Sequence, residues 1–142
     1  MKRILLADDN ALDRKVIMAS FTRLAPTEFE LIEHGECSTI IERSLDLKPH
    51  LLILDRAFTK NQLDNTPEGN DALVLAHRIR EQHPVELQNM AVLVYSRYTQ
   101  PDEGASFSDR FKKQGIWSRA KDRDHQILIA HVREILNQWP RS

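Results

Sequence analysis

The chain is 142 residues long, and its 20 basic and 21 acidic residues leave a formal net charge of −1. This length suits one domain with a single core, and the balanced charge offers no basic field for a polyanion, so we expect no direct nucleic-acid partner. The only cysteine, Cys37, cannot form an internal disulfide, and no apolar stretch reaches the roughly 18 residues that span a bilayer. We therefore expect a cytoplasmic protein with no membrane span.

Short apolar runs recur along the chain and alternate with longer amphipathic segments. The runs lie at 3–7, 29–33, 50–54, 90–95 and, more weakly, 115–118. They are mostly too short for helices and lack a helical period, which favours strands, and those without alternation favour strands covered on both faces. The segments between and after them are predicted to be helices: 11–24, 38–47, 70–82, 102–113 and 124–139.

The first and last predicted helices have the clearest apolar faces. In the first, that face comprises Leu12, Val16, Ile17, Phe21 and Leu24; in the last, it comprises Leu128, Val132, Ile135, Leu136 and Trp139. Asp124 is a candidate N-cap of the last helix. The fourth helix, at 102–113, is poor in apolar residues, which leaves its outward face available to a partner or a second copy of the chain.

A strand followed by a helix, five times over, predicts an α/β fold with a doubly wound five-stranded parallel sheet and helices on both faces. We expect residues 1–142 to form this single domain. In such sheets, ligands bind at the carboxyl ends of the strands. The residues at those ends are therefore the candidates for a functional site.

Polar side chains follow four of the five predicted strands. Asp8 and Asp9 end the first, Asp55 the third and Ser96 the fourth, while Lys121 follows the fifth. Each alone has an ordinary structural explanation, as a helix cap, a turn residue or a solvated lysine. Together they favour a site for a hard divalent cation, because clustered carboxylates repel one another unless a cation lies among them.

Such a cluster has a defined chemistry. Mg²⁺ prefers oxygen ligands and a phosphoryl partner, and a carboxylate beside it can attack phosphorus to form an aspartyl phosphate. A lysine and a hydroxyl can then bind the phosphoryl oxygens. This chemistry makes Asp55 the candidate nucleophile, with Lys121 and Ser96 as the phosphoryl-binding groups.

Four features of the sequence together resemble the receiver domain of response regulators in two-component signalling. They are "ILLADDN" at 4–10, "LLILD" at 51–55, the Ser96 that closes "AVLVYS", and Lys121. The resemblance covers essentially the whole chain. It implies a (βα)5 flavodoxin-like receiver fold, similar to that of the chemotaxis regulators.

The resemblance also implies roles for individual residues. Asp55 would be the phosphoacceptor and a Mg²⁺ ligand, Asp9 a direct Mg²⁺ ligand, and Asp8 a ligand acting largely through water. The backbone carbonyl of Ala57 would be a further ligand. Ser96 and Lys121 would contact the phosphoryl group.

In the family, phosphate comes from a histidine kinase or a phosphotransfer protein. The response is a shift in the face formed by the fourth helix, fifth strand and fifth helix, which binds a downstream protein or a second copy.

The sequence departs from the family pattern at several places. The connection after Asp55, at 56–68, is long and lacks a methionine-proline pair, and Arg97 stands where the family prefers a small residue. Ser118 occupies the place of the family's switch aromatic, and no proline follows Lys121. Trp117 either fills the space of that aromatic or is a plain core residue.

Three functions compete on these observations. The first is a stand-alone receiver with no output domain, since the sequence ends directly after the last predicted helix. The second is a receiver-like adaptor whose partner binding is independent of phosphorylation. The third is a phosphohydrolase, which is disfavoured because Ala57 stands where such enzymes commonly carry a second aspartate as general acid.

Overall fold

The computed structural model describes residues 1–55, 72–96 and 113–140. Within them a five-stranded, all-parallel sheet has the order β2-β1-β3-β4-β5. The strands are β1 (Lys2–Ala7), β2 (Phe29–His34), β3 (Leu51–Asp55), β4 (Ala91–Ser96) and β5 (Ile116–Ala120). The helices are α1 (Ala11–Leu24), the short 3₁₀ helix η1 (Cys37–Thr39), α2 (Ile40–Leu47), α3 (Ala72–Gln82) and α5 (His125–Gln138).

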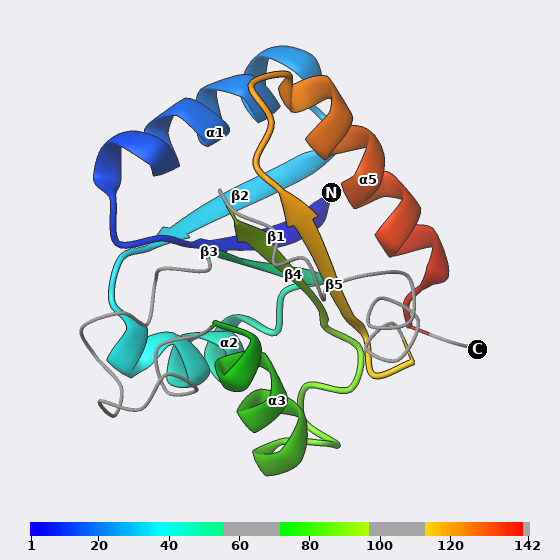
Figure 1. The fold of residues 1–142 in the computed structure, drawn as a ribbon. Coiled ribbons are helices and arrows are strands. Elements are labelled where there is room, and N and C mark those ends of the chain that lie inside the picture. The colour runs from blue at the N-terminus through cyan, green and yellow to red at the C-terminus, as the bar shows by residue number, and fades with distance from the viewer. Residues whose placement is uncertain (56–71, 97–112, 141–142) are drawn as a thin grey trace.

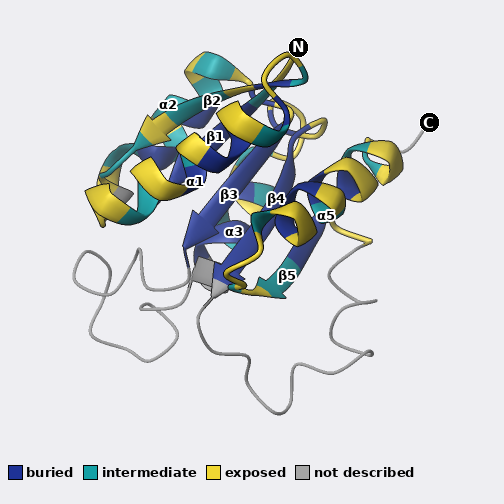
Figure 2. Ribbon diagram, turned by 90° about the horizontal axis from the view of Figure 1, so that it is seen from above, coloured by how far each residue is buried: buried dark blue, intermediate teal, exposed yellow. Residues whose placement is uncertain are grey.

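Helices cover both faces of the sheet, α1 and α5 on one and α2 and α3 on the other (Figure 1). Because successive strand residues point to opposite faces, each face has its own apolar core. Leu52 and Leu54 of β3 belong to the core under α2 and α3, whereas Leu51 and Ile53 belong to the core under α1 and α5. Every residue of β3 is buried (Figure 2), as expected of a central parallel strand.

The predicted fold class is confirmed, and the element bounds differ by a few residues. β3 begins one residue later than predicted and includes Asp55 as its last residue. β5 runs on to Ala120, past the weak apolar run that predicted it. The predicted helix at 102–113 lies outside the described residues except for Lys113.

The exposed surface of α1 corrects one prediction. Ile17 and Phe21 pack against the sheet, but Leu12 and Val16 are 69% and 51% exposed. At about 100° per residue, Leu12 lies on the opposite side of the helix from Phe21, and Val16 lies nearly so. The predicted apolar residues therefore do not share one face, and the side that carries Ile17 and Phe21 is the buried one.

The last helix agrees with the sequence pattern. The Asp124 side chain accepts a hydrogen bond from the Gln126 backbone N–H at 2.9 Å, which confirms the predicted cap. Trp117 is buried and packs edge to face with Trp139 at a ring-centroid distance of 6.2 Å, as a core tryptophan does. Among the described helices, none has the length and apolar character needed to cross a membrane.

Candidate functional site

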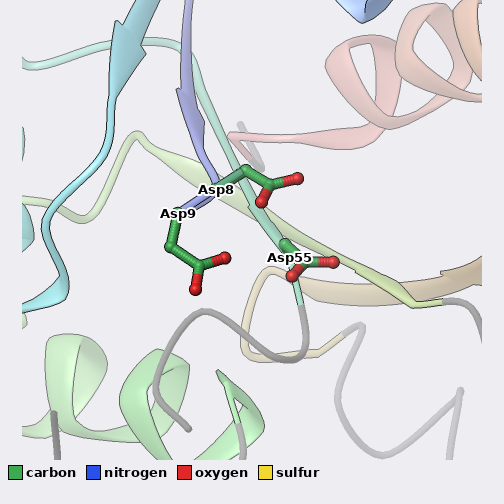
Figure 3. A group of neighbouring side chains, drawn as sticks. All are labelled: Asp8, Asp9 and Asp55. Carbon is green, nitrogen blue, oxygen red and sulfur yellow. The ribbon is translucent and has the colours of Figure 1, made fainter. Parts of the chain in front are cut away.

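Three carboxylates gather where the two central strands end. In the pairing of β1 with β3, Ala7 lies opposite Leu54, so Asp8 and Asp55 are the next residues on neighbouring strands. Asp9 follows in the chain. One carboxylate oxygen from each of Asp8, Asp9 and Asp55 lies within 4.8 Å of the others (Figure 3). The sheet thus brings three anionic groups together at one rim, two of them buried.

Asp8 is the most constrained of these acids. Its side chain is only 2% exposed, and Oδ1 accepts a hydrogen bond from the Asn10 N–H at 2.9 Å. Oδ2 is buried and accepts no hydrogen bond from any described residue. Burial raises the pKa of the Asp8 carboxyl to about 6; the Asn10 hydrogen bond opposes this rise, and the charge of Asp55 adds to it. A buried oxygen without a donor, beside a second anion, is a site that a cation would stabilise.

Lys121 extends into the same cluster from the turn after β5. Its Nζ lies 2.7 Å from Asp55 Oδ1, 3.7 Å from Asp8 Oδ2 and 3.9 Å from Asp13 Oδ2. The ammonium therefore neutralises Asp55 most directly while it also faces two other acids.

Asp13 was missed in the sequence analysis. It lies in the first turn of α1, three residues after the Asn10 cap. Its signal in the sequence is an acidic residue at the start of a helix that begins at the rim where the strands end.

The loop between β1 and α1 is held in place by local hydrogen bonds. The Asn10 side chain caps α1 by accepting the N–H groups of Leu12 and Asp13. Arg14 donates from Nη1 to the Asp8 carbonyl and from Nε to Glu33 Oε1 on β2, the latter at 3.2 Å. Arg14 thus fixes the backbone that carries Asp8, a role that its sequence position alone did not reveal.

The remaining predicted site residues are described only in part. Ser96 is the last residue of β4, on the strand that neighbours β3; its side chain lies outside the described residues. So do Ala57, the connection 56–68 and Arg97.

The donor set suits a hard divalent cation. The Lys121 ammonium lies within 4 Å of three carboxylates, those of Asp8, Asp13 and Asp55, and Asp9 adds a fourth beside Asp8 and Asp55, so Lys121 alone does not balance their negative charge. All the candidate ligand atoms are oxygens, which Mg²⁺ prefers. The buried, unbonded Oδ2 of Asp8 faces this cluster. By donor chemistry and by charge, the residues present fit Mg²⁺.

No protein-family model and no curated protein matches this chain, but its structure is similar to many solved ones. One is the REC domain of AraT, a response regulator from Geobacillus stearothermophilus, at 22% identity, with 96% of this chain and 94% of that chain covered and a TM-score of 0.67. Another is a response regulator from Desulfuromonas acetoxidans, at 18% identity, with 96% and 98% covered and a TM-score of 0.67.

A third similar structure is the chemotaxis protein CheY4 of Vibrio cholerae, at 12% identity, with 95% of this chain and 98% of that chain covered and a TM-score of 0.64. At identities this low, the likeness concerns the fold. The chain has the fold of response-regulator receiver domains over nearly its whole length, as its sequence resemblance implied.

Proposed function

We propose that this chain is a response-regulator receiver that accepts a phosphoryl group on Asp55 in the presence of Mg²⁺ and thereby changes its binding to a partner protein. One observation carries the proposal: the carboxylates of Asp8, Asp9 and Asp55 and the ammonium of Lys121 meet at the carboxyl ends of the strands. This is where parallel α/β sheets bind ligands, and a receiver needs this set of groups there.

In the proposed reaction a carboxylate oxygen of Asp55 attacks the phosphorus of the donor. The new P–O bond forms while the bond from phosphorus to the donor breaks, and the donor leaves with the electron pair of that bond. A histidine kinase or a phosphotransfer protein would donate from a phosphohistidine, and acetyl phosphate would release acetate. When bound, Mg²⁺ would neutralise the phosphoryl oxygens.

Each residue of the site has a proposed task in this reaction. Asp8, Asp9, Asp55 and the backbone carbonyl of Ala57 would hold the Mg²⁺ ion. Lys121, already 2.7 Å from Asp55, would pair with a phosphoryl oxygen once Asp55 is phosphorylated.

Ser96 would donate a hydrogen bond to a second phosphoryl oxygen. The gain of these contacts would bias the chain between two conformations.

The proposed output is signalling through protein contacts. The downstream partner would be another protein or a second copy of the chain, bound through the face of the fourth and fifth helices. No small-molecule turnover is proposed beyond formation and hydrolysis of the aspartyl phosphate, and the proposed setting is the cytoplasm.

The test is incubation of the protein with acetyl phosphate and Mg²⁺, followed by intact-mass measurement. We expect the wild-type protein to gain the mass of one phosphoryl group. It should gain none when Mg²⁺ is chelated before the incubation. Asp55→Asn should form no adduct, and Asp9→Asn should form it much more slowly. Asp46→Asn, which removes an exposed acid on α2, is the matched control and should behave as the wild type does.

Two outcomes would contradict the proposal. An adduct of equal yield in Asp55→Asn would place the modification elsewhere. The absence of any adduct with acetyl phosphate or a phosphohistidine donor, in a folded protein that binds Mg²⁺, would favour an adaptor that does not depend on phosphorylation.

A further inference from the structure

Tyr95 is a buried residue with a polar group in an otherwise apolar strand. It is the next-to-last residue of β4, is 2% exposed, and packs in the core under α1 and α5. Its hydroxyl extends to the turn after β5, where it accepts the N–H of Asp122 at 3.2 Å and lies 3.4 Å from the carbonyl oxygen of the same residue, to which it donates. One hydroxyl thus satisfies both backbone groups of Asp122.

The turn held by this hydroxyl carries Lys121. The Lys121 Nζ lies 5.7 Å from the centroid of the Tyr95 ring, within the range of a cation–π contact. The same Nζ is 2.7 Å from Asp55 Oδ1. Tyr95 therefore contacts the Lys121 head group with its ring, and it contacts the backbone of the next residue, Asp122, with its hydroxyl.

The turn has few other attachments. The Asp124 N–H donates to Asp122 Oδ1 at 3.0 Å, and Asp124 in turn caps α5. For residues 122–124, every other hydrogen bond among the described parts of the chain stays within the turn or leads into α5. Among the described residues, the hydroxyl of Tyr95 is the hydrogen-bonding contact that joins residues 122–124 to the sheet, beside the ion pair that Lys121 makes with Asp55.

A small cavity beside Lys121 would give its side chain an alternative position if the turn were not held by Tyr95. It has a volume of about 120 Å³ and is lined by Asp13, Val16, Ile17, Tyr95, Lys121, Asp122 and His125. A lysine side chain has four rotatable bonds, and Asp13 lies on the α1 side, 3.9 Å from Nζ. If the turn shifted, the ammonium would have both space and an acidic partner away from Asp55.

We propose that Tyr95 is a positioning residue whose hydroxyl holds the turn after β5 so that the Lys121 ammonium stays at Asp55, where it meets the incoming phosphoryl group. The claim that the Lys121 ammonium meets an incoming phosphoryl group rests on the proposed function. The claim that the Tyr95 hydroxyl holds the turn does not. The test therefore has two arms. Its variant is Tyr95→Phe, which removes the hydroxyl and keeps the ring.

The first arm measures hydrogen exchange of the Asp122 amide by NMR, without Mg²⁺ or phosphodonor. Loss of one hydrogen bond should speed its exchange by about 5- to 10-fold in Tyr95→Phe. Thr39→Val is the matched control, because Thr39 makes a hydroxyl contact to His34 at 2.8 Å near β2, the opposite edge of the sheet. In Thr39→Val, the exchange rate of the Asp122 amide, relative to that of the other amides of the chain, should be the same as in wild type.

The second arm measures binding of beryllofluoride, a phosphoryl mimic, at saturating Mg²⁺ through the fluorescence of Trp117 and Trp139. Tyr95→Phe should weaken apparent beryllofluoride affinity by about 5- to 10-fold and leave the Mg²⁺ affinity within about twofold, because Lys121 is not a metal ligand. In a Lys121→Met background, Tyr95→Phe should have no further effect, which is the result expected when Tyr95 acts through Lys121.

The outcomes separate the two claims. Equal exchange of the Asp122 amide in wild type and Tyr95→Phe would overturn the hydroxyl contact. Faster exchange with unchanged beryllofluoride affinity, or an equal loss of affinity in the Lys121→Met background, would overturn the positioning role. If the wild-type protein binds Mg²⁺ but no beryllofluoride, the proposed function fails, and with it the second half of the inference; the exchange arm still decides the first half.

Discussion

Each end of the sheet holds a charged side chain, Asp8 buried at one end and Arg80 partly buried at the other, and the contacts that surround the two charges differ. At the carboxyl ends of the strands, Asp8 keeps one oxygen without a donor and faces other acids. At the amino ends, Arg80 of α3 donates from Nη1 to the Leu87 carbonyl at 2.7 Å and from Nη2 to the carbonyls of Met90 and Gly115, which directly precede β4 and β5. Its guanidinium carbon lies 5.5 Å from the ring centroid of Trp139.

The comparison distinguishes Arg80, whose charge stabilises the fold, from Asp8, whose charge is suited to binding a cation. Burial lowers the pKa of Arg80 to about 10, so it stays charged at neutral pH, and backbone oxygens and an aromatic face compensate that charge. Its Nε alone lacks a partner among the described residues. The buried Asp8 carboxylate is compensated less fully, and this lowers the stability of the metal-free protein. The proposed Mg²⁺ ion would remove that free-energy cost when bound.

The largest effect is expected from Arg80→Met. Removing the guanidinium takes one donor from each of three backbone carbonyls, although those of Leu87 and Gly115 each keep a backbone N–H donor. We therefore expect the free energy of unfolding in urea to fall by about 3 kcal/mol. Arg23→Met, which removes an exposed arginine from the last turn of α1, should change stability by less than about 0.5 kcal/mol. An equal loss in the two variants, or a loss of Mg²⁺ affinity in Arg80→Met, would contradict the division between the two ends.

Asp8→Asn should stabilise the metal-free protein at pH 7. The folded-state pKa of about 6 lies above the ordinary value of 3.8, so ionised Asp8 costs stability at neutral pH, by up to about 3 kcal/mol. The advantage of the variant should shrink as the pH falls from 6 to below 4, where Asp8 is protonated in both states.

Urea unfolding of both proteins across this pH range measures the Asp8 effect, because titrating groups remote from Asp8 cancel in the difference. The charges of Asp55, Lys121 and Asp13 interact with Asp8, so their response is part of that effect. Saturating Mg²⁺ should reverse the order, since it stabilises a protein only where it binds. A variant less stable than wild type in metal-free buffer at pH 7 would contradict the conclusion that the Asn10 N–H and Lys121 only partly compensate the charge of Asp8.

Gly115→Ala sharpens the comparison at the amino ends. Gly115 has a φ of +75°, and a Cβ there would lie 2.7 Å from Arg80 Nη2 and 2.8 Å from the Trp139 ring, so we expect a loss of about 2 kcal/mol. Gly35→Ala is the counterpart near the acidic cluster, where the Cβ would lie 3.0 Å from the movable end of Arg14.

We expect Gly35→Ala to cost less than about 1 kcal/mol but to weaken Mg²⁺ binding, because Arg14 also holds the Asp8 carbonyl. Calorimetric Mg²⁺ titration beside urea unfolding measures both. If Gly115→Ala and Gly35→Ala changed stability and Mg²⁺ affinity in the same proportion, the amino and carboxyl ends of the sheet would not be independent.

A similarly small effect is expected for Asn10→Ala. Its side chain accepts two backbone N–H groups at the start of α1, so its loss should cost about 1 kcal/mol of stability. Asn10→Asp keeps the acceptor and should restore stability, but it adds a charge next to the acidic cluster. A thermal-denaturation series that shows no difference between Asn10→Ala and wild type would contradict the capping role.

The sheet and the acidic rim were predictable because both depend on short apolar runs in the sequence and on the rule that parallel strands end at the same edge of a sheet. Apolar runs ending in Asp8 and Asp55 indicated two buried strands, and parallel strands place such ends side by side. No contact between distant residues had to be known. The same reasoning located Lys121 near the rim, although the polar residues Ser118 and Arg119 obscured the length of β5.

Contacts between side chains of distant residues were not predictable in this way. Tyr95 is a plain apolar strand residue by its pattern, and its hydroxyl contact to Asp122 exists because β4 and β5 are neighbours. Arg80 is one of many charged helix residues until the carbonyls of Met90 and Gly115 surround it. The exposure of Leu12, in contrast, follows from helix geometry, because Leu12 lies about half a turn around α1 from the buried Phe21.

The parallel arrangement of β1, β3 and β5 also has a kinetic consequence. The acidic cluster and Lys121 come from segments far apart in the chain, and they meet only after β1, β3, β4 and β5 have paired. Parallel pairing of this kind forms slowly because long loops must close first. A cation at this rim would therefore act after the rate-limiting step, so we expect Mg²⁺ to slow unfolding in stopped-flow experiments while leaving the refolding rate nearly unchanged.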